Sequence, residues 1–200
     1  PPRRAPQRGD ASVTALIIAV DGPTASGKGT IAKALAAHYG LPHLDTGLLY
    51  RAVGWQCAHN GGNPDDPAAA LAAATFADTL LDEPDLRSEA TGGLASRVSV
   101  HPAVRQALFD RQRAFALQPS GAVLDGRDIG TVIAPEARPK LFVTASVAAR
   151  AQRRWKEMQS RGENHTLATI EADLHRRDAR DRDRAAAPLV RAADAAILDT

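Results

Sequence analysis

A glycine-rich segment constrains the fold of this chain more than any other feature. It runs Gly22-Pro23-Thr24-Ala25-Ser26-Gly27-Lys28-Gly29-Thr30, after a β-branched apolar run at 13–20 and before a run with helical spacing at 30–39. A continuous apolar run of this length is typical of a strand that is buried on both faces. Strand, glycine-rich turn and helix in this order predict the start of a βαβ unit.

The same segment, called the phosphate loop below, has the composition of an anion-binding turn. Gly22 and Gly27 let the backbone curl so that successive N–H groups converge on phosphate oxygens, and the helix N-terminus adds partial positive charge. Lys28 can reach the β- and γ-phosphates of a nucleotide. The alternative is a plain glycine-rich turn with a chance lysine, and the flanking strand and helix argue against it.

Short buried strands and helices alternate along the rest of the chain. Further strands are predicted at 42–45, 122–125, 141–144 and 195–199, and further helices at 48–58, 67–81, 102–117, 146–161 and 166–184, with irregular structure at 82–93. This alternation predicts a doubly wound α/β sheet in one domain from residue 13 to 200. Ligands of such sheets bind at the carboxyl ends of the strands, where Asp21, Asp45, Asp125 and Asp199 stand.

The segment Asp45-Thr46-Gly47-Leu48-Leu49-Tyr50-Arg51 is a candidate acceptor site. The Thr46 hydroxyl can bind a base or a sugar, and Arg51 can hold a phosphate through two hydrogen bonds. A helix cap made by Asp45 and Thr46 is the alternative, and the two roles are compatible. Arg105 lies in the first turn of a predicted helix, where a cation is unfavourable, which suggests an anionic partner.

The segment Asp125-Gly126-Arg127-Asp128-Ile129-Gly130-Thr131 is the second strong signal. It gathers two carboxylates, an arginine and two glycines at a strand end. Arg127 is a candidate for an acceptor phosphate and Asp128 for a base amino group or a sugar hydroxyl, while Asp125 can orient hydrated Mg²⁺. A purely structural turn is the alternative.

Arginines outnumber lysines by 21 to 4. A composition bias of the source genome explains such a ratio, and so does phosphate recognition by planar guanidinium groups. Arg150, Arg153 and Arg154 share one helix face, and Arg177, Asp181 and Arg184 share another. A solvated, ion-paired helix surface is the alternative for both, and it is our interpretation of Arg176, Arg180 and Arg182.

The single cysteine, the first residues and the length of the apolar runs indicate where the protein is located. Cys57 is the single cysteine, so no disulfide within the chain is possible, which favours a reducing, cytoplasmic location. We expect residues 1–12 to form a disordered basic tail, and no apolar run has the ~20 residues of a membrane-spanning helix. We expect a monomer that binds neither nucleic acid nor membranes.

Together these motifs resemble one family, the bacterial cytidylate kinases. The likeness extends from residue 16 to 199 and includes the phosphate loop with its Gly-Lys-Gly-Thr ending, Asp45 to Arg51, Ser96 with Pro102 to Arg105 and Gln112-Arg113, Asp125 to Asp128, Thr144 to Ser146, and 177–188. The resemblance implies a P-loop three-layer sandwich with a five-stranded parallel sheet, a short acceptor-binding insert at about 60–95 and a small lid at about 150–165.

The resemblance also implies a role for each matching residue. The phosphate loop would bind ATP together with the lid arginines, which are Arg150, Arg154 and Arg161. The CMP site would comprise Thr46, Tyr50, Arg51, Ser96, Arg105, Arg127, Asp128, Arg177, Asp181 and Arg184. Lys28, Arg127, Asp128 and Arg184 would act in catalysis, and Mg²⁺ would accompany ATP near Thr30 or Asp125.

Three departures from the family pattern stand out. Thr46 replaces the usual serine, the insert between Asn63 and Gly93 is too short for the small β-sheet of longer members, and the sequence stops at Thr200, where the family pattern leads us to expect a closing helix. The expected reaction is in-line transfer of the γ-phosphoryl group of ATP to CMP or dCMP, without a covalent enzyme intermediate. Alternatives are a kinase for UMP, AMP or a metabolite hydroxyl, a nucleotide-binding switch, and a nucleic-acid-binding module.

Overall fold

A computed structural model describes residues 15–200 of the chain, so the predicted tail at 1–12 and the first residues of the predicted domain lie outside the described part. The elements are, in order, β1 (Ile17–Asp21), α1 (Lys28–Tyr39), β2 (His43–Asp45), α2 (Thr46–His59), α3 (Pro67–Ala72), η1 (Asp78–Asp82), η2 (Pro84–Arg87), α4 (Glu89–Val98), α5 (Pro102–Ala116), β3 (Ala122–Gly126), η3 (Ile129–Ile133), β4 (Lys140–Thr144), α6 (Val147–Ser160), α7 (Leu167–Asp183) and β5 (Ala196–Asp199).

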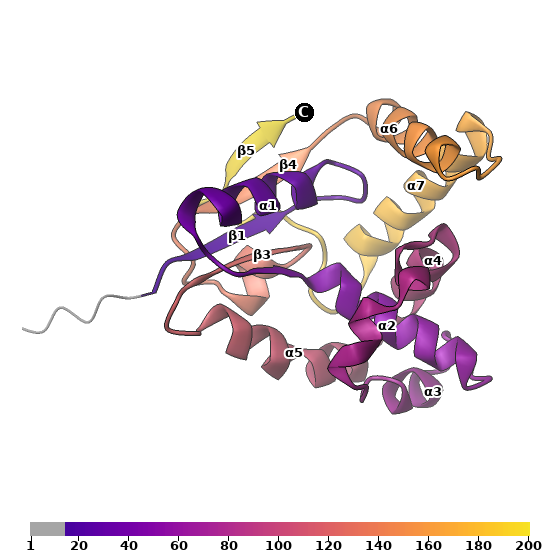
Figure 1. Cartoon of the computed structure of the whole chain (residues 1–200), viewed down its shortest axis with the longest axis horizontal. Coiled ribbons are helices and arrows are strands. Elements are labelled where there is room, and N and C mark those ends of the chain that lie inside the picture. The colour runs from indigo at the N-terminus through magenta and orange to yellow at the C-terminus, as the bar shows by residue number, and fades with distance from the viewer. Residues whose placement is uncertain (1–14) are drawn as a thin grey trace, which may run out of the picture.

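The five strands form one parallel sheet in the order β2-β3-β1-β4-β5, which confirms the predicted α/β fold. Asp21 pairs in register with Gly126, and Asp45 pairs with Asp125. The polar residues that end these strands therefore meet at one edge of the sheet. Figure 1 shows two helical groups beyond that edge, α2 to α4 on one side and α6 with α7 on the other.

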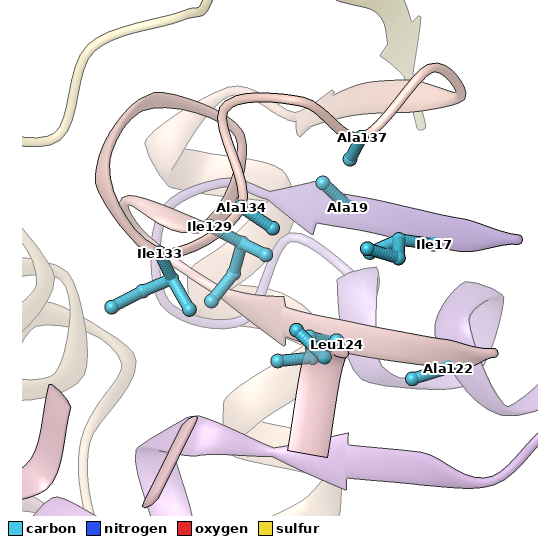
Figure 2. Packing of buried hydrophobic residues seen from close by; sticks show 9 residues of the cluster. Ile17, Ala19, Ala122, Leu124, Ile129, Ile133, Ala134 and Ala137 are labelled. Atoms are coloured by element: carbon cyan, nitrogen blue, oxygen red, sulfur yellow. The ribbon is translucent and has the colours of Figure 1, made fainter. Parts of the chain in front are cut away.

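The core has a layer on each face of the sheet because strand side chains alternate between the faces. Ile18 and Val20 pack with Ala32 and Ala36 of α1. Ile17, Ala19, Ala122 and Leu124 face the other way and pack with Ala116 of α5 and with the segment that follows β3, which contributes Ile129, Ile133, Ala134 and Ala137 (Figure 2). The predicted three-layer sandwich is confirmed.

The region between residues 67 and 98 differs from the sequence-based expectation. The helix predicted at 67–81 ends at Ala72, and the carbonyl oxygens of Ala73 and Thr75 beyond it accept hydrogen bonds from Nε2 of Gln56 instead of continuing the helix. The prediction of irregular structure at 82–93 is wrong, since this segment contains η2 and the first half of α4. Ser88 caps α4 by accepting a hydrogen bond from the Thr91 N–H, and no strand occurs among the residues of this region.

One short element follows β3 directly and was not predicted. η3 is a π-helical turn, and its first two N–H groups donate hydrogen bonds to the Asp21 carboxylate, at 2.8 Å from Ile129 and 2.8 Å from Gly130. Asp21 ends β1, so this contact ties the phosphate loop to the segment that carries Arg127 and Asp128. No helix within residues 15–200 combines the length and the apolar composition that a membrane crossing requires.

Candidate active site

A cavity of about 240 Å³ opens at the carboxyl ends of β1, β2 and β3. The phosphate loop and the strand ends form one wall, α2 and α4 form a second, and α6, α7 and Arg184 form a third. Its lining residues are Thr24, Ala25, Lys28, Gly29, Asp45, Thr46, Gly47, Tyr50, Arg51, Gly92, Ala95, Ser96, Ser99, Arg105, Asp125, Gly126, Arg127, Asp128, Arg154, Arg177, Asp181 and Arg184. Most of the site residues expected from the sequence are therefore brought together.

The phosphate loop has the tight backbone that its glycines suggested. A side chain at Gly22 would place Cβ 2.1 Å from the Val143 carbonyl oxygen, so only glycine fits there. Gly27 adopts a φ of 87° at the start of α1, and Ala25 also has a positive φ, 61°. Desolvation within the site, assisted by the nearby Arg127 charge, lowers the pKa of Lys28 to about 8.

Arg51 extends from α2 towards α4 and donates hydrogen bonds to two backbone carbonyl oxygens, 2.7 Å from that of Leu86 and 2.8 Å from that of Ser88. Burial and the neighbouring charges of Arg154 and Arg177 lower its pKa to about 10. No carboxylate within residues 15–200 forms an ion pair with Arg51, although the site around it is crowded with positive charge. This guanidinium therefore remains available to an anionic ligand.

Arg105 forms a buried ion pair with Asp128, and its guanidinium lies 5.4 Å from the ring centroid of Tyr50. The anionic partner expected from the position of Arg105 is thus a side chain of the same protein. Burial raises the pKa of Tyr50, so the phenol stays protonated beside this pair. A guanidinium and a carboxylate held side by side offer donors and an acceptor to a planar base.

Arg127 connects three parts of the site. It donates hydrogen bonds to Asp181 of α7 at 2.5 Å and to the Thr24 hydroxyl of the phosphate loop at 2.6 Å. Although burial favours the neutral acid, Arg127 and Arg184 hold the pKa of Asp181 below its usual range. Arg184 keeps a buried Nη2 atom without a hydrogen-bond partner among residues 15–200, which leaves a donor free for a ligand.

Glu89 was not predicted as a site residue, and it lies between two of the predicted arginines. Its carboxylate pairs with Arg154 of α6 and with Arg177 of α7. We call Arg51, Arg105, Arg127, Arg154, Arg177 and Arg184 the arginine belt. Every member lines the cavity, and each donates to a carboxylate or to a backbone carbonyl of the protein.

Seven of the predicted ATP-binding residues do not line this cavity; they are Arg150, Arg161, Thr30 and, within the phosphate loop, Gly22, Pro23, Ser26 and Gly27. Arg150 is buried against α7, where it pairs with Asp178 and donates to the Ala145 and Thr24 carbonyl oxygens. Arg161 is exposed and contacts Glu157 and the Arg87 carbonyl oxygen. Thr30 is exposed on α1. Of the helix arginines assigned to the surface, Arg180 instead donates to the Ser96 hydroxyl at 2.5 Å.

Asp125 is the best-placed residue for an Mg²⁺ that accompanies a nucleotide. Its Oδ2 lies 2.7 Å from Nε2 of His43, and Oδ1 faces Gly29 of the phosphate loop. The Thr46 hydroxyl donates to the Asp125 carbonyl oxygen at 2.8 Å. Within residues 15–200, no three His, Cys, Asp or Glu side chains gather as a metal cage. This arrangement fits Mg²⁺, which usually keeps several waters and binds few protein carboxylates.

Two features of the site escaped the sequence analysis. Asp21 was noticed only as a strand end, because its partners, the N–H groups of η3, are over 100 residues away. The inner face of α4 presents the small residues Gly92, Ala95 and Ser96 to the cavity, at helical spacing. A Cβ at Gly92 would lie 2.8 Å from the Arg51 guanidinium, so this glycine makes room for an arginine.

Comparisons with known proteins agree with this geometry. The family model described as cytidylate kinase matches residues 18–200. The chain is 58% identical over 187 residues to the cytidylate kinase of Caulobacter sp. (strain K31), covering 93% of this chain and 87% of that protein. It is 57% identical over 185 residues to that of Azorhizobium caulinodans, covering 92% and 90%. For Rhodopseudomonas palustris (strain BisA53) the identity is 58% over 185 residues, covering 92% and 88%.

These matches extend over nearly the whole described chain and include both the phosphate loop and the arginine belt. They confirm the resemblance that the motifs suggested. The chain belongs to the cytidylate kinase family.

Proposed function

We propose that this protein transfers the γ-phosphoryl group of ATP to CMP or dCMP, giving ADP and CDP or dCDP. The observation that carries the proposal is one cavity with two kinds of anion-binding wall. Lys28 and the phosphate loop face it from the sheet, and the arginine belt faces it from the helices. Two phosphorylated substrates can thus bind with their phosphates directed towards each other, as in-line transfer requires.

On the acceptor side, we assign the base to the pocket around Arg105, Asp128 and Tyr50. The Asp128 carboxylate can accept a hydrogen bond from the exocyclic amino group of cytosine, and Arg105 can donate to a ring nitrogen or carbonyl. Uracil carries a carbonyl where cytosine has the amino group, so its oxygen would face the carboxylate. Thr46 and Ser96 would complete the pocket.

The phosphate of CMP belongs, in this proposal, between Arg51, Arg127, Arg177 and Arg184. The free Nη2 donor of Arg184 supports this assignment, because a buried donor without a partner is costly unless a ligand satisfies it. Asp181, held by Arg127, would accept a hydrogen bond from the sugar. The segments at about 60–95 and 150–165 would act as acceptor-binding insert and lid.

No side chain needs to act as a base, because the phosphate oxygen of CMP is itself the nucleophile. Lys28, Arg127 and Arg184 would stabilise charge that develops during transfer. When bound, Mg²⁺ neutralises charge on the β- and γ-phosphates, and Asp125, with Thr30 as a further candidate, would hold its hydration shell. The lid arginines Arg154, Arg150 and Arg161 would close on the triphosphate and exclude water. We expect a cytoplasmic monomer that acts on free nucleotides.

A panel of acceptors tests the proposal. ADP formation is measured with ATP and Mg²⁺ in the presence of CMP, dCMP, UMP, AMP or no acceptor. CMP or dCMP should give the highest kcat/KM, and turnover without an acceptor should be very low. A preference for AMP over CMP would contradict the cytidine assignment, and tight nucleotide binding without acceptor-dependent turnover would favour a switch.

A further inference from the structure

Glu89 joins three parts of the chain beside Arg154 and Arg177, which line the cavity. It belongs to the first turn of α4, where a carboxylate is favoured by the helix dipole. Oε2 accepts from Arg154 of α6, with the Arg154 Nε at 2.8 Å, and Oε1 accepts from Arg177 of α7. A single carboxylate therefore holds two arginines from two other helices next to Arg51.

The charges at this point do not balance. Arg51, Arg154 and Arg177 together carry three positive charges, and Glu89 supplies one negative charge. Glu157 also pairs with Arg154, at 3.0 Å, but it lies on the exposed side of α6. The excess positive charge affects Arg51, since the charges of Arg154 and Arg177 both contribute to its lowered pKa. A group with two negative charges and several acceptor oxygens would satisfy these guanidiniums better than one carboxylate.

We propose that Glu89 is a displaceable internal anion: in the free protein it pairs with Arg177, beside Arg51, in place of the acceptor phosphate, and it holds Arg154 of the lid at the same time. It is a positioning residue: it assembles the two helix arginines before the substrate arrives, and it must release them when the phosphate binds. This inference rests on the function proposed above, and it adds a residue that sets the affinity for the acceptor.

The surrounding contacts allow this exchange. The Glu89 side chain is 18% exposed, so it can turn towards solvent after it releases Arg154 and Arg177. Two other contacts hold α4 and its preceding turn against α6 and α7 without Glu89. Arg180 donates to the Ser96 hydroxyl, and Arg161 donates to the Arg87 carbonyl oxygen. Loss of the Glu89 pairs therefore frees the arginines without separating the helices.

The consequence is that Glu89 competes with the acceptor. Part of the binding free energy of CMP is spent on breaking the Glu89 pairs, so removal of the charge should tighten binding. A purely structural role predicts the opposite, because misplaced arginines bind phosphate less well. The direction of the change in affinity thus separates the two roles.

The test uses Glu89→Gln, which keeps the size of the side chain and removes its charge. Binding of CMP alone is measured by isothermal titration calorimetry on the whole protein, without ATP. We expect the Kd of the variant to be roughly threefold to tenfold lower than that of the wild type. Glu157→Gln is the matched control, since it removes an exposed pair of the same Arg154, and its Kd should stay within about twofold.

An unchanged or higher Kd in Glu89→Gln overturns the inference. If this variant does not fold, Glu89→Asp takes its place: it keeps the charge, but its shorter side chain no longer reaches both arginines, so a smaller decrease in Kd is expected and any increase overturns the inference. The wild-type titration is independent of these outcomes. If the wild type binds no CMP, the proposed function itself fails.

Discussion

In the proposed function, the phosphate loop and the arginine belt would bind the same kind of group in different ways. The loop uses consecutive residues, backbone N–H groups and one lysine, and Lys28 forms no ion pair with any residue in the part of the chain that the structure describes. The belt uses arginines from five different places in the chain. Most of them are already paired with Asp128, Asp181 or Glu89.

The difference indicates that the two walls need different amounts of free energy to release their existing partners when a ligand binds. Lys28 has no counter-ion to give up among residues 15–200, and the start of α1 adds partial positive charge, so a phosphate can bind the loop without displacing a carboxylate. Belt arginines would repel one another without counter-charges, so the protein neutralises them, and binding an acceptor exchanges one partner for another. Substitutions in the loop should therefore affect chemistry most, whereas substitutions in the belt should affect acceptor affinity.

The largest effect is expected from Lys28→Ala. This change removes the one mobile charge of the loop, and kcat with CMP should fall about 10²- to 10³-fold, while KM for CMP changes little. Steady-state ADP formation measures both constants, and thermal unfolding shows whether the variant is folded. Near-normal turnover in a folded variant would show that Lys28 is not needed for phosphoryl transfer, and the proposed difference between loop and belt would be wrong.

Arg105→Gln tests the belt and should raise KM for CMP about a hundredfold, with KM for ATP nearly unchanged. The loss includes the penalty of leaving the Asp128 carboxylate buried without its partner. The double variant Arg105→Gln with Asp128→Asn should therefore lose less free energy of CMP binding than the two single variants lose in sum. If the free-energy changes calculated from the three KM ratios are strictly additive, the pair does not act as a unit.

Asp21→Asn tests the contact that links the two walls. Burial raises the pKa of Asp21 from 3.8 to about 6, so the stabilising contribution of its protonated form is fully present below pH 3.8 and is lost as the pH rises through 6. Asn carries no such dependence. The free energy of unfolding of the variant, relative to wild type, should increase by about 2 kcal/mol between pH 4 and 7. Urea unfolding at both pH values measures it, and a constant difference would argue against a raised pKa.

The smallest effect concerns the pH dependence of the loop. Because the pKa of Lys28 is lowered to about 8, its charge is lost as the pH rises, and kcat/KM for ATP should fall about tenfold per pH unit above that value. Lys28→Arg keeps its charge over this range, so its smaller kcat/KM should not show the same fall. Parallel pH profiles for the two proteins would assign the decline to another group.

Much of the fold could be predicted because its signals are local. The phosphate loop, the helix end at Gly40 and the strands at 122–125 and 141–144 are each visible within a few residues, and the structure confirms these elements. Only the strand at 122–125 is buried throughout, as predicted; in the other, Leu141, Phe142 and Thr144 are half-buried. The helix α4 was missed because Gly92 lowers helix propensity, yet packing against Arg51 requires a residue without a side chain there. The packing of Gly92 against Arg51 therefore outweighed the low helix propensity of glycine.

The sequence by itself determined that a phosphate-binding loop follows the first strand, that polar residues gather at one edge of a parallel sheet, and that arginines of the cytidylate kinase pattern are present. Only the tertiary structure decided which carboxylate each arginine contacts. Glu89 pairs with residues 65 and 88 positions away, and Asp21 holds η3 from over 100 positions away. Such pairs leave no local signal, because Coulomb attraction and desolvation depend on distance in space and not on separation along the chain.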